Sequence, residues 1–422
     1  MYFYSLYLRS IKRMMKTSSI YIFNPGHDLA LANGSFSFIP PHAVQLMSND
    51  LSLLPVWYAD DNSIVLSPNA AADQFMDIMR KQLPILNKYS INVVNPVISS
   101  IPISSGTDLS ICPWGWDRSV REYLKRCGIP MSSMPTDKQL DDIKWLSNRK
   151  RAVELLQRLK SNSNCIGESE YLTDLESCLE YVKRHKECVF KAPLSGSGKG
   201  LNWYRDGIFT SPFERWCHRQ LSSQGGVIAE PVYSKILDFA MEFYIDKGAK
   251  ASFAGYSFFD TSKTGAYLSN RLVSNDYDSD KEYMKFVTEQ LKPRILSEVD
   301  QLFCNKYQGF LGIDMMLCEG NEDESFLIHP CVEINSRMTM GIFSRIFYDR
   351  YVHEGREGVY HVDYFKKEGE AYQLHLEMQR KYPLHLFDDK IDSGYIPLIP
   401  INEQTHFSAW ALFLPASFKK II

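Results

Sequence analysis

The sequence predicts a mixed α/β protein in which a small parallel α/β domain precedes a larger region of strands and helices. Three observations support this prediction. Short apolar runs alternate with helical segments from residue 19 to about residue 130, β-rich segments follow between residues 202 and 266, and an apolar hairpin spans residues 309–341. Alternating strands and helices favour a parallel sheet, whose ligands lie beyond the carboxyl ends of its strands.

Composition limits the function classes. The 422 residues suggest two or three domains, and 45% hydrophobic with 23% charged residues is typical of a soluble globular protein. A net charge of −3 provides no basic field for nucleic acid or a membrane surface. Nine cysteines without a C-x-x-C pair indicate a reducing compartment. No apolar run reaches transmembrane length, so we expect a cytoplasmic protein with neither nucleic-acid nor membrane partners.

The first 18 residues are interpreted as an N-terminal extension, because their apolar run precedes their basic residues, the reverse of a secretory signal. Met14 and Met15 are alternative translation starts to Met1. The remaining chain is divided into residues 19–130, 131–350 and 351–422. We expect the last part to pack on the core, where it could extend the sheet, cover the site or support a homodimer.

The hairpin carries a polar face. Two β-prone runs flank the acidic segment Glu319–Ser325, and alternation along the second run places Glu333, Asn335 and Arg337 on one side. Pro330 lies inside that run and predicts an edge strand or a bulge, because proline cannot donate to the ladder.

A turn centred between Asp323 and Glu324 would place Asp314 opposite Glu333. Two opposed carboxylates repel each other unless a positive charge lies between them. Mg²⁺, bound through carboxylate and amide oxygens and through substrate phosphates, would remove that repulsion. The alternative is that both acids face water or pair with basic neighbours such as Arg337.

A second stretch, Glu187–Leu201, predicts a short apolar strand that carries Lys191 and a Gly/Ser-rich loop after it. Glycine lets backbone N–H groups approach an anion, and Lys191 and Lys199 add charge for phosphates. The loop has the spacing of neither a P-loop nor a dinucleotide fingerprint. A flexible hairpin connection is the alternative explanation.

The order of these parts resembles the ATP-grasp superfamily over roughly Lys150 to Met340. The shared pattern is a strand lysine, a glycine-rich loop, an "EPV" strand end and a D…E-x-N hairpin. The resemblance implies an ATP-grasp fold of two α+β subdomains, preceded by a small Rossmann-like parallel α/β domain. It also implies ATP and Mg²⁺ (or Mn²⁺) as cofactors.

Residue roles follow from the resemblance. Asp314, Glu333 and Asn335 would hold the metal, and Lys191 would contact the nucleotide phosphates. The mobile loop over the phosphates would be Ser195, Gly196, Ser197, Gly198, Lys199 and Gly200.

Further nucleotide contacts are implied at three positions. Glu230 and Val232 match the clamp segment that meets adenine and ribose. Lys150 matches an earlier nucleotide-binding lysine of the family, although Arg149 and Arg151 are equally basic neighbours.

Two arginines are candidates to neutralise a phosphate in transfer, because guanidinium binds phosphate through two parallel hydrogen bonds. Arg337 continues the metal-binding strand. Arg271 precedes a helix predicted over residues 279–304, which Pro293 should kink or split. A structural role is the alternative for Arg271.

The first domain supplies substrate candidates. Its loops Asn24–Asp28 and Pro113–Asp117 follow predicted strands, and in ATP-grasp proteins such a domain helps to bind the acceptor substrate. Turn chemistry and aromatic packing are the alternative explanation of these loops. The candidates are His27, Asp28, Trp116 and Asp117.

The activity that the resemblance implies is an ATP-dependent ligase. It would activate a small-molecule carboxylate as an acyl phosphate and condense it with an amine or a thiol, releasing ADP and phosphate. A small-molecule kinase on the same fold and a non-catalytic ATP-binding regulatory protein are the alternatives.

Overall fold

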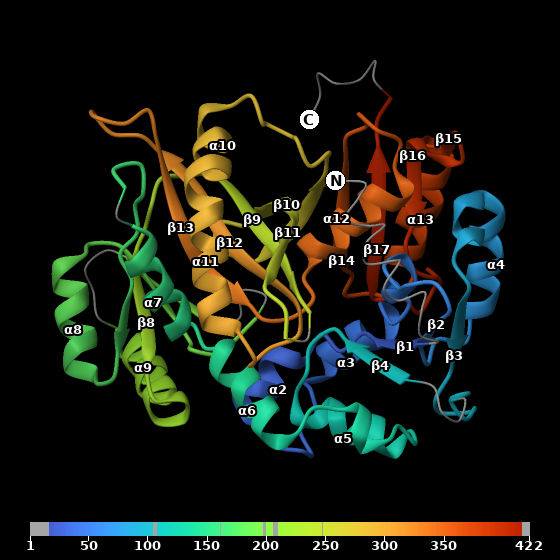
Figure 1. The fold of residues 1–422 in the computed structure, drawn as a ribbon, viewed down its shortest axis with the longest axis horizontal. Coiled ribbons are helices and arrows are strands. Elements are labelled where there is room, and N and C mark those ends of the chain that lie inside the picture. Colours follow the sequence, from blue (N-terminus) through green and yellow to red (C-terminus); the bar gives the residue numbers. More distant parts are fainter. Residues whose placement is uncertain are drawn as a thin grey trace.

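The computed structural model describes residues 17–103, 108–160, 162–196, 200–205, 210–246 and 248–415. Three sheets organise this part of the chain (Figure 1). Most of the predicted N-terminal extension and the loop residues Ser197, Gly198 and Lys199 lie outside the described residues. None of the helices in the described ranges has both the length and the apolar character that a membrane-spanning helix needs.

The N-terminal domain contains a parallel sheet of the order β3-β2-β1-β4, which confirms the predicted parallel α/β domain. Its strands are short, and buried apolar side chains such as Ile20, Ile64 and Ile111 join them in one core. The elements are β1 (Thr17–Ile22), α2 (His27–Asn33), α3 (His42–Asp50), β2 (Ser63–Leu66), α4 (Ala72–Gln82), β3 (Ile91–Val94), β4 (Asp108–Pro113) and α5 (Arg118–Arg126).

Helix α6 (Asp137–Leu146) leads from this domain into a small antiparallel sheet of the order β5-β8-β6-β7. The Thr136 hydroxyl and the Gln139 side chain form a capping box that starts α6. The small sheet has its own core around Tyr181 and Phe190. Its elements are β5 (Glu170–Leu172), α8 (Leu175–Arg184), β6 (Cys188–Lys191), β7 (Leu201–Tyr204), α9 (Ser211–Gln224) and β8 (Val227–Pro231).

The third sheet has nine strands in the order β13-β12-β9-β10-β11-β14-β17-β16-β15. One face is covered by α7 (Lys150–Leu159), α10 (Glu282–Phe286) and α11 (Lys292–Phe303) (Figure 1). A π-helical turn over Val287–Leu291 lies between α10 and α11, and Pro293 is the second residue of α11, so the predicted helix is irregular just before the proline. The central strands are β9 (Lys235–Ile245), β10 (Ala251–Thr261), β11 (Tyr267–Leu272), β12 (Gly309–Glu319) and β13 (Phe326–Asn335).

The C-terminal part extends this same sheet. Helix α12 (Met340–Tyr351) packs into a core that also contains Trp57 of the N-terminal domain and Tyr360 of the C-terminal part. Of the three alternatives for residues 351–422, the described residues take the first, because their strands continue the nine-stranded order. The elements are β14 (Gly358–Tyr364), α13 (Glu370–Lys381), β15 (His385–Phe387), β16 (Lys390–Pro397) and β17 (Phe407–Phe413).

The register of the acidic hairpin is the predicted one at the site. Asp314 pairs with Glu333, and Gly312 pairs with Asn335. Nearer the turn Glu319 pairs with Phe326, so the turn is centred one residue earlier than predicted. The register then shifts between Met316 and Asp314, in the part of β13 that contains Pro330. This shift brings Asp314 opposite Glu333, as predicted. β13 is also the terminal strand of the sheet, so both expectations for Pro330 are confirmed.

Candidate active site

The site is built on one face of the hairpin β12–β13. Asp314 and Glu333 are opposed across the two strands, and the Asn335 amide donates a hydrogen bond of 3.1 Å to Oδ2 of Asp314. Desolvation by the surrounding protein and the nearby charge of Glu333 raise the pKa of Asp314 to about 7. The carboxylate repulsion that the sequence predicted is therefore present in the structure.

Strand β9 adds two acids to the same face. Ala240 pairs with Asp314, so the residues two before and two after it, Asp238 and Glu242, share the face of Asp314. Glu242 is buried and accepts a hydrogen bond of 2.7 Å from the Ser257 hydroxyl. Burial raises the pKa of Glu242 to about 8. In the sequence, Asp238 and Glu242 are four residues apart in a predicted strand, and this even spacing places both side chains on one face.

Two glycines make room for the Glu242 carboxyl. A Cβ atom at Gly312 would lie 2.5 Å from its Oε2 atom, and one at Gly341 would lie 2.2 Å from its Oε1 atom. Gly312 belongs to β12 and Gly341 to the first turn of α12. The carboxyl of Glu242 is thus enclosed between the sheet and the start of this helix.

Arg149 is the cation that reaches the hairpin. Its Nη2 atom lies 2.6 Å from Oε1 of Glu333, and the side chain is buried. The same guanidinium donates to the carbonyl oxygen of Ala192 at 2.7 Å and to the Ser195 hydroxyl at 2.6 Å. Arg149 therefore ties the hairpin to the start of the glycine-rich loop.

Lys150, the predicted nucleotide contact, points elsewhere. Its side chain is exposed, and its ammonium lies 4.9 Å from the centre of the Tyr171 ring. Arg151 pairs with Glu154 at 2.7 Å. Of the three adjacent basic residues, the structure brings Arg149 to the acidic face.

Lys191 lies at the end of β6, where it meets Glu230 of β8. Its Nζ atom is 2.5 Å from Oε2 of Glu230, both side chains are buried, and the Ser169 hydroxyl donates to the other carboxylate oxygen at 3.1 Å. His329 of β13 lies near this pair, and burial lowers its pKa to about 4. Neither ring nitrogen of His329 has a hydrogen-bond partner among the described residues. Val232 is partly exposed just after β8.

Arg337 continues the face beyond Asn335. Its Nε and Nη2 atoms donate to the Asp28 carboxylate at 3.1 and 2.9 Å. Burial alone would raise the pKa of Asp28, but the Arg337 guanidinium beside it keeps that pKa below its ordinary value. The two domains therefore meet at an ion pair between two predicted site residues.

The other candidates of the first domain have structural contacts. Asp117 caps α5, because one of its oxygens accepts hydrogen bonds from the backbone N–H groups of Ser119 and Val120. His27 is buried against Gly115, and Trp116 packs on the core of the parallel sheet. These three residues make contacts inside the first domain, whereas Asp28 reaches Arg337.

Arg271 lies on the opposite face of the large sheet. Strand pairing runs from Arg271 through Phe258 and Phe239 to Met315, which alternates with Asp314. The guanidinium pairs with Asp260 at 3.3 Å. The structure therefore does not bring Arg271 to the acidic face.

The described ends of the glycine-rich loop are held in place. The Ala192 N–H donates to the carbonyl oxygen of Gly200 at 2.8 Å, and a Cβ atom at Gly200 would lie 2.0 Å from the Ser195 hydroxyl oxygen. A Cβ atom at Gly196 would lie 2.1 Å from Oδ2 of Asp28. A side chain at either glycine would force the Ser195 hydroxyl or the Asp28 carboxylate to shift.

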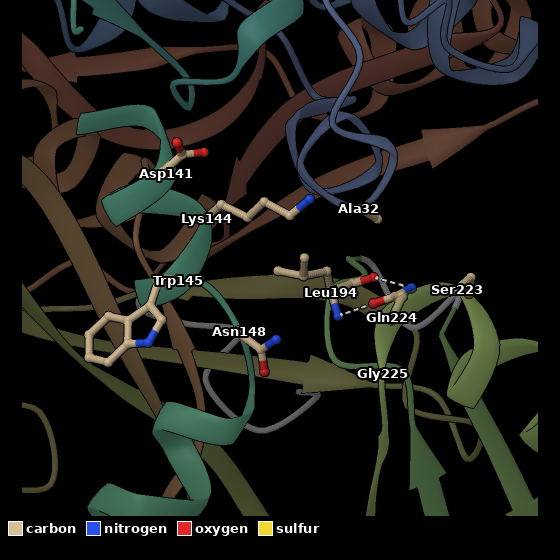
Figure 2. A pocket seen from close by; sticks show the side chains of 9 residues that line it. All are labelled: Ala32, Asp141, Lys144, Trp145, Asn148, Leu194, Ser223, Gln224 and Gly225. Atoms are coloured by element: carbon tan, nitrogen blue, oxygen red, sulfur yellow. Dashed lines mark hydrogen bonds between the residues drawn. The ribbon is translucent and has the colours of Figure 1, made fainter. Parts of the chain in front are cut away.

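A pocket of about 400 Å³ lies beside the loop (Figure 2). The Gln224 side chain accepts a hydrogen bond of 2.7 Å from the Leu194 N–H and donates one of 3.3 Å to its carbonyl oxygen. In Figure 2 the Lys144 side chain extends from α6 towards Ala32. The lining residues are Ala32, Asp141, Lys144, Trp145, Asn148, Leu194, Ser223, Gln224 and Gly225.

The donor set fits a small hard cation. Asp314, Glu333 and Asn335 offer carboxylate and amide oxygens, the ligands that Mg²⁺ takes in proteins alongside substrate phosphates. Desolvation and the charge of Glu333 raise the pKa of Asp314 although Arg337 lowers it, so a cation bound there would favour the charged carboxylate. Within the described ranges no group of three His, Cys, Asp or Glu side chains forms a metal cluster, so a metal here would depend on the amide and on ligand oxygens.

No protein-family model matches the sequence, and no curated protein matches it. Solved structures that are similar over nearly the whole chain include ATP-grasp enzymes.

Two of these structures are representative. One is N5-carboxyaminoimidazole synthetase from Staphylococcus aureus with ADP, at a TM-score of 0.48 and 9% identity, covering 94% of this chain and 93% of that chain. Another is a biotin carboxylase ATP complex from Campylobacter jejuni, at a TM-score of 0.48 and 11% identity, covering 95% and 87%.

Proposed function

We propose that this protein is an ATP-dependent ligase that activates a carboxylate as an acyl phosphate and passes the acyl group to an amine or a thiol. One observation carries the proposal. Two opposed carboxylates and an amide on β12–β13 have two guanidinium groups beside them: Arg149, which pairs with Glu333, and Arg337, two residues beyond Asn335. Lys191 adds an ammonium group at the end of β6, before the glycine-rich loop. Acids that repel each other, with cations around them, suit a metal-bound triphosphate.

Each group has a role in this proposal. Asp314, Glu333 and Asn335 would hold Mg²⁺, which when bound shields the charge of the β- and γ-phosphates. Arg149 and Lys191 would exchange their present carboxylate partners in part for phosphate oxygens. This would position the γ-phosphate for attack by the substrate carboxylate.

The glycine-rich loop would exclude water. Its described ends, Ser195 and Gly200, contact each other and Arg149, so the segment between them starts and finishes beside the proposed phosphate site. An acyl phosphate hydrolyses in water, and a loop closed over it would favour attack by the amine or thiol.

A substrate screen tests the proposal. The purified chain with Mg²⁺ and ATP is incubated with paired panels of carboxylates and of amines or thiols, and ADP release is measured with mass spectrometry of the product. We expect ADP release that requires both substrates and yields an amide or thioester. A stable phosphorylated product would instead indicate a kinase, and failure to bind ATP with Mg²⁺ would contradict both activities.

A matched pair of variants sharpens the screen. Glu333→Gln should lower ADP release at least about tenfold, because a metal ligand is lost. Glu319→Gln changes an exposed acid of the same hairpin and should leave the rate unchanged.

A further inference from the structure

The ion pair of Arg337 and Asp28 has the geometry of anion recognition. Two nitrogen atoms of the guanidinium face the two oxygen atoms of one carboxylate, at 3.1 and 2.9 Å. This parallel arrangement is the one by which arginine binds a carboxylate or a phosphate. The carboxylate of Asp28, from the N-terminal domain, is thus bound to the guanidinium of Arg337, which adjoins the proposed metal ligands.

Asp28 also touches the glycine-rich loop. Its Oδ2 atom lies so close to Gly196 that a Cβ atom there would displace the Asp28 carboxylate. On its other side the loop is held by Arg149, which donates to the carbonyl oxygen of Ser195 at 3.1 Å. Asp28 therefore links three parts of the site: the first domain, the loop and the strand that carries Arg337.

The pair is accessible enough for exchange. Arg337 and Asp28 expose 15% and 20% of their side chains. Leaving a partly buried guanidinium unpaired is costly, whereas replacing one carboxylate by another keeps both hydrogen bonds. A carboxylate from solution can therefore take the place of Asp28 with both hydrogen bonds of the guanidinium kept, and the displaced Asp28 carboxylate must then be solvated by water.

The pocket of Figure 2 is lined by residues that are close in the sequence to Asp28 and to Gly196. Ala32 follows Asp28 by one helical turn on α2, and Leu194 precedes Gly196 by two residues. Lys144 gives this pocket a cationic group, while Asp141 is paired with Arg118 at 2.8 Å. This pocket offers a small anionic molecule space and a cationic group.

We propose that Asp28 holds the place of the substrate carboxylate, so that the two carboxylates compete for Arg337. When the ligand binds Arg337, Asp28 leaves the guanidinium and its contact with Gly196. The inference rests on the proposed function and assigns the ligand class at one point of that site, a small molecule bearing a free carboxylate.

Removing the competing charge tests the inference. Asp28→Asn keeps the shape of the side chain but weakens its hold on Arg337. Binding of ¹³C-labelled acetate and succinate to the full chain is measured by NMR titration at constant ionic strength. We expect both ligands to bind about fivefold more tightly to Asp28→Asn than to the unmodified protein, and Arg337→Lys to abolish the gain.

Asp260→Asn is the matched control. It removes the partner of Arg271 on the opposite face of the sheet, where the arginine is 36% exposed, and should leave acetate and succinate binding unchanged. Equal affinities in Asp28→Asn and the unmodified protein, or an equal gain in Asp260→Asn, would overturn the inference. Asp28→Ser gives the same comparison if the asparagine variant does not fold.

Failure of the inference can be separated from failure of the proposed function. Binding of a non-hydrolysable ATP analogue with Mg²⁺ is measured on the same samples. If the nucleotide analogue binds but Asp28→Asn does not bind acetate and succinate more tightly, only the proposed role of Asp28 is rejected. A carboxylate gain in Asp28→Asn without nucleotide binding would support that role and reject the ATP site.

Discussion

The two faces of the nine-stranded sheet differ in character although the same strands build both. Along β9, Phe239 and Phe243 are buried against α10 and α11, whereas Asp238 and Glu242 point to the other side with Asp314. Burial of each phenylalanine stabilises the fold by about 1.5–3 kcal/mol. The acids oppose folding, as the raised pKa values of Glu242 and Asp314 indicate.

The comparison shows which face is organised for binding. The apolar face is explained by packing alone. The acidic face has Arg149 from the start of α7 and Arg337 from just beyond β13, and it still keeps two carboxyl groups with raised pKa values. A bound cation and its phosphate ligands would resolve this imbalance.

The largest effect on stability is expected from removing the guanidinium group of Arg149 from the acidic face. Arg149→Met leaves the half-buried Glu333 without its guanidinium and removes hydrogen bonds to Ala192 and Ser195. We expect a loss of about 3–5 kcal/mol in the free energy of unfolding, measured by urea denaturation. Lys150→Met, at the exposed neighbour, should cost no more than about 1 kcal/mol. Equal losses would show that Arg149 does not support this face.

The second prediction tests the acidic face through the dependence of stability on pH. The pKa of Asp314 is about 7 in the folded protein, against about 3.9 for an unfolded aspartate. Between these values the unfolded chain binds fewer protons, so stability falls as the pH rises towards 7 and the full cost is present above it.

Asp314→Asn should therefore raise the melting temperature by about 3–8 °C at pH 8, with the gain shrinking towards pH 4. Differential scanning calorimetry across this range measures the effect. Mg²⁺ should narrow the gap at pH 8 by stabilising only the unmodified protein. A gain that is independent of pH would argue against desolvation and the repulsion between Asp314 and Glu333 as its cause.

The smallest expected effect is on the opposite face. Arg271 and Asp260 form a partly exposed pair, which contributes at most about 1 kcal/mol. Arg271→Met should lower the free energy of unfolding by no more than that amount and leave ATP binding unchanged. Loss of ATP binding in this variant would remove the distinction between the two faces.

Sequence reasoning succeeded where one local rule decides the outcome. The alternation of Glu333 with Asn335 and the lost ladder donor of Pro330 placed the metal candidates and the irregularity of β13 correctly. The pairing of Asp314 with Glu333 was also correct, although it depends on the irregularity as well as on the turn.

Other features could not be predicted because they depend on contacts between distant segments. Arg149 and Lys150 are adjacent and equally basic, so only the packing of α7 decides which of them reaches Glu333. The pair of Asp28 and Arg337 joins residues 309 positions apart. The face on which Arg271 lies follows from the successive pairings of β11 with β10, β10 with β9 and β9 with β12. The residue pattern of one strand does not reveal these pairings.

The central claim is that the acidic face binds ATP through a divalent cation, and calorimetric titration tests it most directly. A non-hydrolysable ATP analogue is titrated into the unmodified protein, Asp314→Asn and Glu319→Gln, with and without Mg²⁺. We predict Mg²⁺-dependent binding that Asp314→Asn weakens at least about tenfold and Glu319→Gln leaves unchanged. Binding of equal strength in all three proteins, or binding indifferent to Mg²⁺, would contradict the claim.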